Sequence, residues 1–127
     1  MKLYLSADME GSAGLTTESE YTPGHPDYAF YRAQMSREAA AACRGAVRAG
    51  AADILVRDAH YDARNLDPTE FPECVRLLRG HTGDCFPMVS GLQLERFDAC
   101  LFTGYHSGVT SPACPLSHTF SRSSYDD

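Results

Sequence analysis

The amino-acid sequence predicts an α/β fold, in which an open and mainly parallel sheet is flanked by helices. Three short apolar runs, at residues 2–7, 54–56 and 99–103, are continuous rather than alternating, which is typical of parallel strands with both faces buried. A segment of helical periodicity at residues 27–49 separates the first two runs, as the crossover between two parallel strands requires. The length of 127 residues fits one domain.

The first expected strand, residues 2–7, ends at a loop of residues 8–14 that contains two glycines. Residues 21–26 contain Pro23, Gly24 and Pro26, and we expect them to be irregular because proline and glycine interrupt regular structure.

A long helix is expected next, at residues 27–49, with Asp27 as its N-cap and Gly50 as its C-terminal stop. Apolar residues recur along it at spacings of three and four and mark one buried stripe. The stripe consists of Tyr28, Tyr31, Met35, Ala39, Ala42, Cys43, Ala46 and Val47.

The second half of the chain is less regular in its pattern. Residues 54–56 and 99–103 are expected strands, whereas 75–78 fits either a short strand or part of a helix, and 88–94 is ambiguous. Loops or turns are expected at 64–69, 81–84 and 107–115, which are rich in Gly, Pro, Ser, Thr, Asn and Asp. We therefore expect one α/β domain over residues 1–120, followed by a polar tail at 121–127 that has no packing pattern.

Composition excludes several classes of function. The net charge of −6, with basic residues scattered along the chain, argues against nucleic acid as a partner, because phosphate binding needs clustered Lys and Arg. No apolar stretch is long enough to cross a membrane. The five cysteines form no C-x-x-C pair and no signal peptide precedes the first strand, which favours reduced thiols in a cytoplasmic protein. Cys100 lies in an apolar run and is an expected core residue.

Polar, ligand-type residues follow three of the expected strands directly. Asp8 and Glu10 come after the first strand, Asp58 and His60 after the second, and His106 after the last. Because the carboxyl ends of parallel strands lie along one edge of a sheet, and ligands bind in the crevice there, these side chains should meet in one place.

The residue types in this group suit a divalent metal. Residues two apart on an extended chain point to the same side, so Asp8 and Glu10 can face a common ion. Two imidazoles with two or three carboxylates suit zinc or a similar divalent ion, and a carboxylate with two oxygens can bridge two metals that activate a water molecule. Asp58 is either a direct ligand or a group that orients His60, and the second role is favoured.

Five segments together resemble the zinc-dependent D-aminopeptidases of the DppA type. They are Met1 to Leu15 with its D-M-E-G motif, Val56 to His60 with D-x-H, Met88 to Leu92, Phe102 to His106 and Leu116 to Thr119. Their order and approximate spacing also match the family, and the resemblance extends from residue 1 to about residue 120.

This resemblance implies a cytoplasmic zinc peptidase that removes D-amino acids, such as D-alanine, from the N-terminus of short peptides. It implies a site with two zinc ions, in which Asp8 bridges the metals and Glu10, His60 and His106 are further ligands. His118 would be the catalytic histidine. The resemblance also implies assembly into ring-shaped homo-decamers that enclose the active sites.

One feature of the family pattern is missing from this chain. The resemblance implies another glutamate ligand downstream of the Ser-His motif, but no glutamate follows Glu95. We therefore expect a truncated version of the family fold, with an incomplete metal site and an exposed sheet edge that favours self-association.

Three hypotheses about function follow. The first is a metal-dependent aminopeptidase that acts on N-terminal D-residues. The second is a truncated, catalytically impaired homologue that serves as a metal-binding or oligomer-forming domain. The third is another metal-dependent hydrolase such as a phosphatase, although the sequence has no Gly-rich phosphate loop or arginine cluster.

Overall fold

A computed structural model describes residues 1–109, 111 and 116–118 of the chain. A four-stranded parallel sheet forms its centre, with the strand order β3-β2-β1-β4. The helices and strands are β1 (Lys2–Ala7), α1 (Glu18–Tyr21), α2 (Tyr28–Arg48), β2 (Asp53–Asp58), the 3-10 helix η1 (Pro68–Glu70), β3 (Val75–Leu78), the 3-10 helices η2 (Pro87–Val89) and η3 (Leu92–Leu94), and β4 (Ala99–Thr103). The predicted fold class is confirmed.

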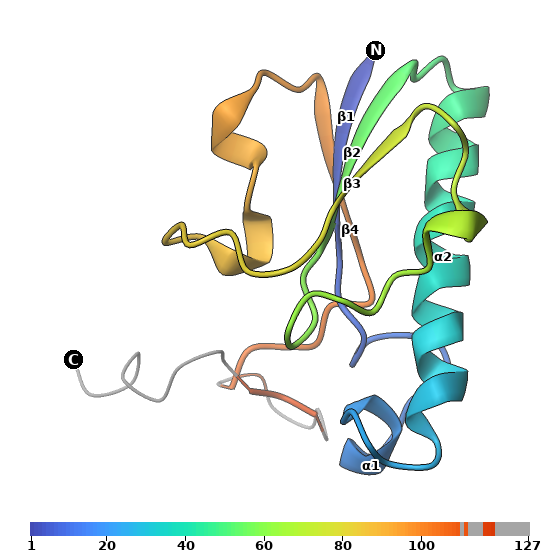
Figure 1. The fold of residues 1–127 in the computed structure, drawn as a ribbon, viewed down its shortest axis with the longest axis vertical. Coiled ribbons are helices and arrows are strands. Elements are labelled where there is room, and N and C mark those ends of the chain that lie inside the picture. Colours follow the sequence, from blue (N-terminus) through green and yellow to red (C-terminus); the bar gives the residue numbers. More distant parts are fainter. Residues whose placement is uncertain (110, 112–115, 119–127) are drawn as a thin grey trace.

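All three strand pairings are parallel, so the carboxyl ends of the strands lie at the same edge of the sheet (Figure 1). Ala7 at the end of β1 is in register with Asp58 at the end of β2 and with Thr103 at the end of β4. The residues that follow these three positions therefore start from the same level of the sheet.

Helix α2 covers one face of the sheet (Figure 1). Leu5 of β1, Val56 of β2 and Met35 of α2 are buried in one apolar cluster. Met9, just beyond β1, is fully buried in the same cluster. Met9 lies between Asp8 and Glu10 in the chain. Its burial on this face therefore anchors the start of the loop after β1.

The opposite face of the sheet is covered by the segment of residues 79–97, which contains η2 and η3 (Figure 1). Polar groups attach this segment to the strands: the Tyr4 hydroxyl donates a hydrogen bond to the Ser90 carbonyl (2.9 Å), and the Arg57 Nε donates one to the Pro87 carbonyl (3.0 Å). The ambiguous residues 88–94 thus form short 3-10 turns rather than a strand or an α-helix.

Strand β4 lies at an edge of the sheet, and its apolar side chains are exposed. Phe102 is 53% exposed and Leu101 36%, and Cys100 is exposed as well. The expectation that Cys100 is a core residue is therefore wrong. A run of apolar residues indicates a strand, but it does not reveal whether the strand lies at an edge of the sheet with its side chains exposed.

The main helix agrees with its prediction to within one residue at each end. Val47 does not belong to the buried stripe, since it is 39% exposed, and the Asp27 side chain makes no capping hydrogen bond although the residue occupies the N-cap position. Helix α1 was not predicted. Its sequence signal is a T-x-x-E capping box, in which Glu20 accepts a hydrogen bond from the backbone N–H of Thr17 (2.9 Å).

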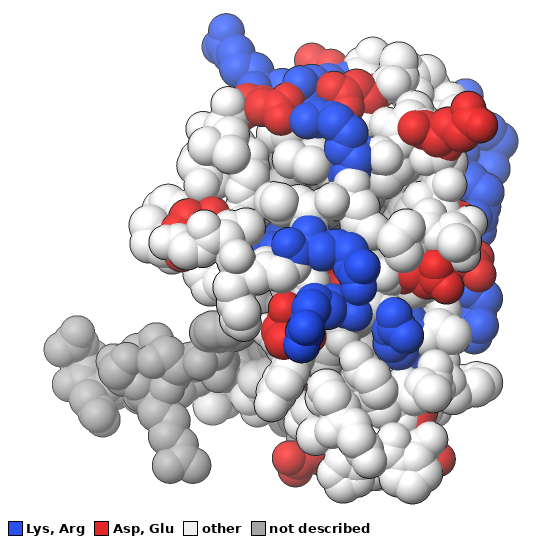
Figure 2. Space-filling model, viewed as in Figure 1, with Lys and Arg blue, Asp and Glu red and all other residues white. Residues whose placement is uncertain are grey.

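Charged side chains of both signs are interspersed on the surface, as Figure 2 shows for one face. Arg76 bridges Asp53 and Glu95, and Lys2 contacts the same two carboxylates. Among the described residues, no helix has the length and apolar character needed to cross a membrane.

Candidate metal centre

The loops that follow β1, β2 and β4 are held together by backbone hydrogen bonds that continue the sheet. The Asp8 N–H donates to the Thr103 carbonyl (2.9 Å), and the Ala59 N–H donates to the Ala7 carbonyl (2.8 Å). Further along, the Gly11 N–H donates to a carbonyl of the loop after β4, that of Gly104 (2.7 Å). These bonds fix the three segments that carry the predicted ligands.

Asp8, Glu10 and His60 form a buried cluster at this edge. His60 Nδ1 lies 3.3 Å from Asp8 Oδ1 and 3.2 Å from Glu10 Oε2. All three residues are buried, and one ligand atom from each lies within 4.8 Å of the others. This spacing allows the three side chains to contact one common ion, as the positions after β1 and β2 predicted.

His106 and His118 approach the same two carboxylates from another side. His106 Nε2 lies 3.7 Å from Asp8 Oδ2, and His118 Nε2 lies 3.6 Å from Glu10 Oε1. The two imidazole rings stack with centroids 3.6 Å apart. The site therefore gathers all five of the predicted metal and catalytic residues.

The three histidines are oriented in the same manner, each by one backbone carbonyl. His60 donates from Nε2 to the Tyr21 carbonyl (2.8 Å), His106 from Nδ1 to the Ser107 carbonyl (2.8 Å), and His118 from Nδ1 to the Leu116 carbonyl (2.9 Å). In each ring the other nitrogen faces a carboxylate. Histidines that bind metals are typically fixed in this manner, with the second nitrogen donating to a carbonyl or carboxylate.

Burial and proximity shift the pKa values of the inner cluster. Burial raises the pKa of the Asp8 carboxyl above its ordinary value. Burial also opposes ionisation of Glu10, but its contacts with His60 and Asp8 lower the Glu10 pKa below its ordinary value. For His60, burial favours the neutral ring, yet hydrogen bonds to Asp8 and Glu10 raise its pKa to about 10. At neutral pH a proton on His60 Nδ1 therefore sits between the two carboxylates.

The donor set fits a divalent metal. Asp8 Oδ2 is a buried carboxylate oxygen with no hydrogen-bond partner among the described residues, and such a group is costly unless a cation compensates it. Imidazole nitrogens and carboxylate oxygens are the ligands that zinc accepts. His60 Nδ1, Asp8 Oδ1 and Glu10 Oε2 are close enough together to contact one ion.

A cavity of about 430 Å³ opens onto this cluster. Three carboxylates line it, from Asp8, Glu10 and Glu18, together with His60 and His118. We name it the acidic cavity. Its charge favours ligands that carry a cation or an ammonium group.

Comparison with known proteins places the chain in a family. The family model for D-aminopeptidases matches residues 1–127. The chain belongs to the D-aminopeptidase family. The resemblance inferred from the five sequence segments is therefore confirmed.

Two comparisons describe relatives within the D-aminopeptidase family. A D-aminopeptidase of Bacillus subtilis (strain 168) is 34% identical over 119 residues, which are 94% of this chain and 42% of the relative. A solved structure, described as the Zn-dependent D-aminopeptidase DppA from Bacillus subtilis, a self-compartmentalizing protease, matches with a TM-score of 0.86 at 34% identity. That match covers 95% of this chain and 43% of the solved chain. This chain thus spans less than half the length of these relatives.

Asp58 is hydrogen-bonded to the loop that follows β2 rather than to the His60 ring. Its Oδ2 accepts hydrogen bonds from the backbone N–H groups of Asn65 (2.6 Å) and Leu66 (2.7 Å), and its Oδ1 accepts one from Asn65 Nδ2 (2.9 Å). Asn65 Nδ2 also donates to the His60 carbonyl (2.6 Å). Asp58 therefore holds the loop after β2 in shape and acts on the His60 backbone, not on its ring.

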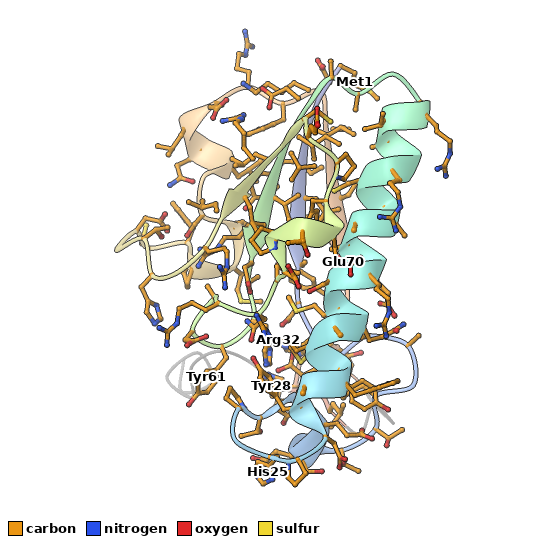
Figure 3. All side chains as sticks on the ribbon, turned by 45° about the vertical axis from the view of Figure 1, so that its right-hand side comes forward. Met1, His25, Tyr28, Arg32, Tyr61 and Glu70 are labelled. Carbon is orange, nitrogen blue, oxygen red and sulfur yellow. The ribbon has the colours of Figure 1, made fainter. Side chains whose placement is uncertain are left out.

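The loop after β2 is also attached to helix α2. Figure 3 shows Tyr28 and Arg32 projecting from the lower part of α2, on the same side as the labelled Tyr61. The Tyr28 hydroxyl donates to Asn65 Oδ1, and Arg32 Nε donates to the Asn65 carbonyl (2.7 Å). Asn65 therefore joins the helix, the loop and Asp58.

Sequence reasoning missed two contributors to the site. Tyr21 supplies the carbonyl that orients His60, and its ring packs edge-on against the His60 ring. Tyr105 is hydrogen-bonded through its hydroxyl to Ser6 Oγ (2.7 Å) and donates to the Met88 carbonyl (3.2 Å). The capping box of α1 could have directed attention to Tyr21, whereas a backbone carbonyl leaves no sequence signal.

The cysteines that the structure describes are free thiols, namely Cys43, Cys74, Cys85 and Cys100. Cys114, Thr119 and the expected domain boundary at residue 120 lie outside the described residues, so the boundary stays a prediction.

Proposed function

We propose that the protein is a zinc-dependent aminopeptidase that hydrolyses N-terminal D-amino acids, such as D-alanine, from short peptides. The observation that carries the proposal is the buried Asp8–Glu10–His60 cluster, in which Asp8 Oδ2 lacks a hydrogen-bond partner within the part of the chain that the structure describes. The chain's membership of the D-aminopeptidase family and its likeness to a Zn-dependent relative support the proposal, and they favour a peptidase over a phosphatase.

We further propose two zinc ions per subunit, with Asp8 as the bridging ligand. Each carboxylate has one oxygen near His60 and the other near a second histidine: Asp8 faces His60 and His106, and Glu10 faces His60 and His118. This division of oxygens supports one ion bound by Asp8, Glu10 and His60 and another beside Asp8 and His106. When bound, zinc polarises a substrate carbonyl and lowers the pKa of a bound water molecule.

The protein's own groups hold the substrate and transfer protons. The acidic cavity receives the free amino terminus of the peptide, which is the feature that an aminopeptidase must recognise, and Glu18 is the carboxylate of its lining that is not a proposed zinc ligand. His118 is the catalytic histidine in this proposal, because its side chain is 40% exposed, compared with 14% for His106 and 3% for His60. Its Nε2 faces the acidic cavity and Glu10, so it can pass a proton to the departing amine.

The proposed partners of the protein are short peptides and further copies of the same chain. The relative of known structure is described as a self-compartmentalizing protease, which supports a homo-oligomer. We propose that this homo-oligomer is the ring-shaped decamer that the family resemblance implied. We also propose the cytoplasmic location that the resemblance implied. Neither nucleic acid nor membrane is a proposed partner.

The alternative is a catalytically impaired homologue that binds metal or forms oligomers. The observation in its favour is that the chain spans 42% of the length of a D-aminopeptidase from Bacillus subtilis. In this case the chain holds a metal at Asp8, Glu10 and His60 or serves in assembly alone, and it does not turn over peptides.

Metal analysis and peptide hydrolysis, both measured on the purified 127-residue chain, distinguish these proposals. We expect bound zinc and release of D-alanine from D-alanyl peptides, and a chelator should abolish the release. Folded protein that holds zinc without hydrolysing these peptides would support the alternative. Folded protein with no bound metal and no turnover would contradict the first proposal and support the alternative in its oligomer-forming role.

Variants of single residues test the assignment of the site. Asp8→Ala and His60→Ala should both lose zinc, whereas His25→Ala, which changes an exposed loop histidine, should retain it. His118→Ala should retain zinc and lose turnover. Loss of zinc in His118→Ala would make that residue a ligand instead, and full occupancy in both Asp8→Ala and His60→Ala would refute the metal centre.

A further inference from the structure

A second cavity, of about 250 Å³, lies beside the metal centre. Its lining is mostly apolar and includes Leu15, Leu116, Gly11 and Tyr105. We name it the Leu15 cavity. Its volume is below the roughly 300–1,000 Å³ of pockets that enclose whole small molecules, so it can take one part of a ligand, such as a single side chain.

The Leu15 cavity and the acidic cavity meet at Glu10, which is the one described residue that lines both. His106, a proposed zinc ligand, forms part of the wall of the Leu15 cavity. A ligand can therefore place its charged end in the acidic cavity at Glu10 and an apolar group in the Leu15 cavity, on the other side of the same carboxylate.

We propose that the Leu15 cavity binds the side chain of the substrate's N-terminal residue. This inference rests on the proposed aminopeptidase function and adds the substrate class: D-residues with small to medium apolar side chains. Three groups radiate from the Cα of that residue. When the ammonium group and the scissile carbonyl are held at the acidic cavity, the configuration at Cα decides whether the side chain points into the Leu15 cavity or away from it.

Thr16 and Leu15 set the size of this cavity. Leu15 is buried and packs in the main apolar cluster, so it forms a fixed wall. Thr16 is exposed at the rim, where its N–H (2.6 Å) and its hydroxyl (3.2 Å) both donate to Glu20 Oε2. The rim is therefore anchored to α1, and a larger side chain at position 16 would project over the cavity without disturbing the core.

The test compares D-leucyl-glycine with D-alanyl-glycine as substrates. Thr16→Trp should lower the ratio of kcat/KM for the D-leucyl over the D-alanyl peptide by about ten- to a hundred-fold, the discrimination that a few methylene groups give in an apolar pocket. Leu15→Val should raise the same ratio. The matched control is Thr69→Trp, because Thr69 is an exposed threonine whose N–H and hydroxyl both donate to one carboxylate oxygen, Asp67 Oδ1, away from the site.

A binding measurement separates this inference from the proposed activity. Free D-leucine and D-alanine are titrated calorimetrically into the zinc-loaded chain, and the ratio of their affinities should fall in Thr16→Trp as the kinetic ratio does. If the wild-type chain hydrolyses neither peptide, the proposed function fails, but a changed affinity ratio still supports the cavity. A ratio within twofold of the wild-type value in both variants, or no binding of either amino acid, would overturn the inference.

Discussion

Gly11 and Gly104 should be required for the metal centre, although neither provides a ligand. A Cβ atom on Gly11 would lie 2.2 Å from the Tyr105 carbonyl oxygen, and one on Gly104 would lie 2.1 Å from the Asp8 carbonyl oxygen. Real Cβ atoms do not approach backbone atoms so closely. The loop that carries Asp8 and the loop after β4 therefore pack against each other through two glycines.

Alanine substitutions at four glycine positions separate two effects, namely the clash of an added Cβ with nearby backbone and the cost of a left-handed backbone conformation. Gly104 has both a close backbone contact and a φ of +65°, and Gly11 has the contact alone. Gly24 has a φ of +93° with open space around it, and Gly108 has neither constraint. A left-handed backbone costs about 1–2 kcal/mol for an alanine, and an added methyl group in a packed site costs about 1–3 kcal/mol.

The expected losses in the free energy of unfolding follow from this comparison. Gly104→Ala should lose about 2–5 kcal/mol and Gly11→Ala about 1–3 kcal/mol, whereas Gly24→Ala should lose about 1–2 kcal/mol. Gly108→Ala should stay within about 0.5 kcal/mol of the wild type. Urea denaturation measures these values, provided that the slope of the transition is unchanged.

Zinc content gives the functional half of this test. Gly11→Ala and Gly104→Ala should lose zinc affinity because they separate the loops that carry the ligands, and Gly24→Ala should keep it even though it is less stable. The reasoning is refuted if Gly11→Ala and Gly104→Ala unfold at the same urea concentration as Gly108→Ala and bind zinc equally well.

Three further predictions concern the buried charges. Zinc affinity should rise about tenfold per pH unit between pH 6 and 8, because the pKa of His60 is raised to about 10 and zinc must displace its proton. Titration of the protein with zinc at several pH values measures this affinity, and an affinity that does not change with pH would contradict the prediction. Zinc at a hundredfold excess over its Kd should stabilise the chain by about 2.7 kcal/mol, a gain that thermal melting should not find in Asp8→Ala. Asp58→Ala should destabilise the fold by about 3 kcal/mol or more, since it removes the acceptor of three buried hydrogen bonds. Urea denaturation measures this loss, with Glu73→Ala, a change at an exposed carboxylate, as the control.

The architecture of the sheet was predictable because a parallel strand carries its signal locally. A continuous apolar run marks each of β1, β2 and β4, and the long helix between β1 and β2 implies the parallel crossover. Once the strands are parallel, the polar residues after them must share one edge, which is why Asp8, Glu10, His60 and His106 could be grouped without coordinates.

The contacts that orient the ligands could not be predicted in the same way. Every residue has a carbonyl, so nothing in the sequence distinguishes Tyr21 as the acceptor for His60. Asp58 illustrates the opposite problem, since its side chain is of a ligand type but its oxygens are occupied by the loop that follows it. The exposure of Cys100 depends on what covers an edge strand, which is a property of distant parts of the molecule.

The balance of charge explains how two carboxylates can be buried side by side. Asp8 and Glu10 would repel each other strongly in a buried site if both were ionised without a counter-charge. The proton on His60 Nδ1 supplies that charge, because this nitrogen lies 3.3 Å from Asp8 Oδ1 and 3.2 Å from Glu10 Oε2. A bound metal would replace that charge, and the Tyr21 carbonyl would still orient the imidazole through Nε2. Because zinc must displace that proton, pH is a sensitive control of zinc occupancy.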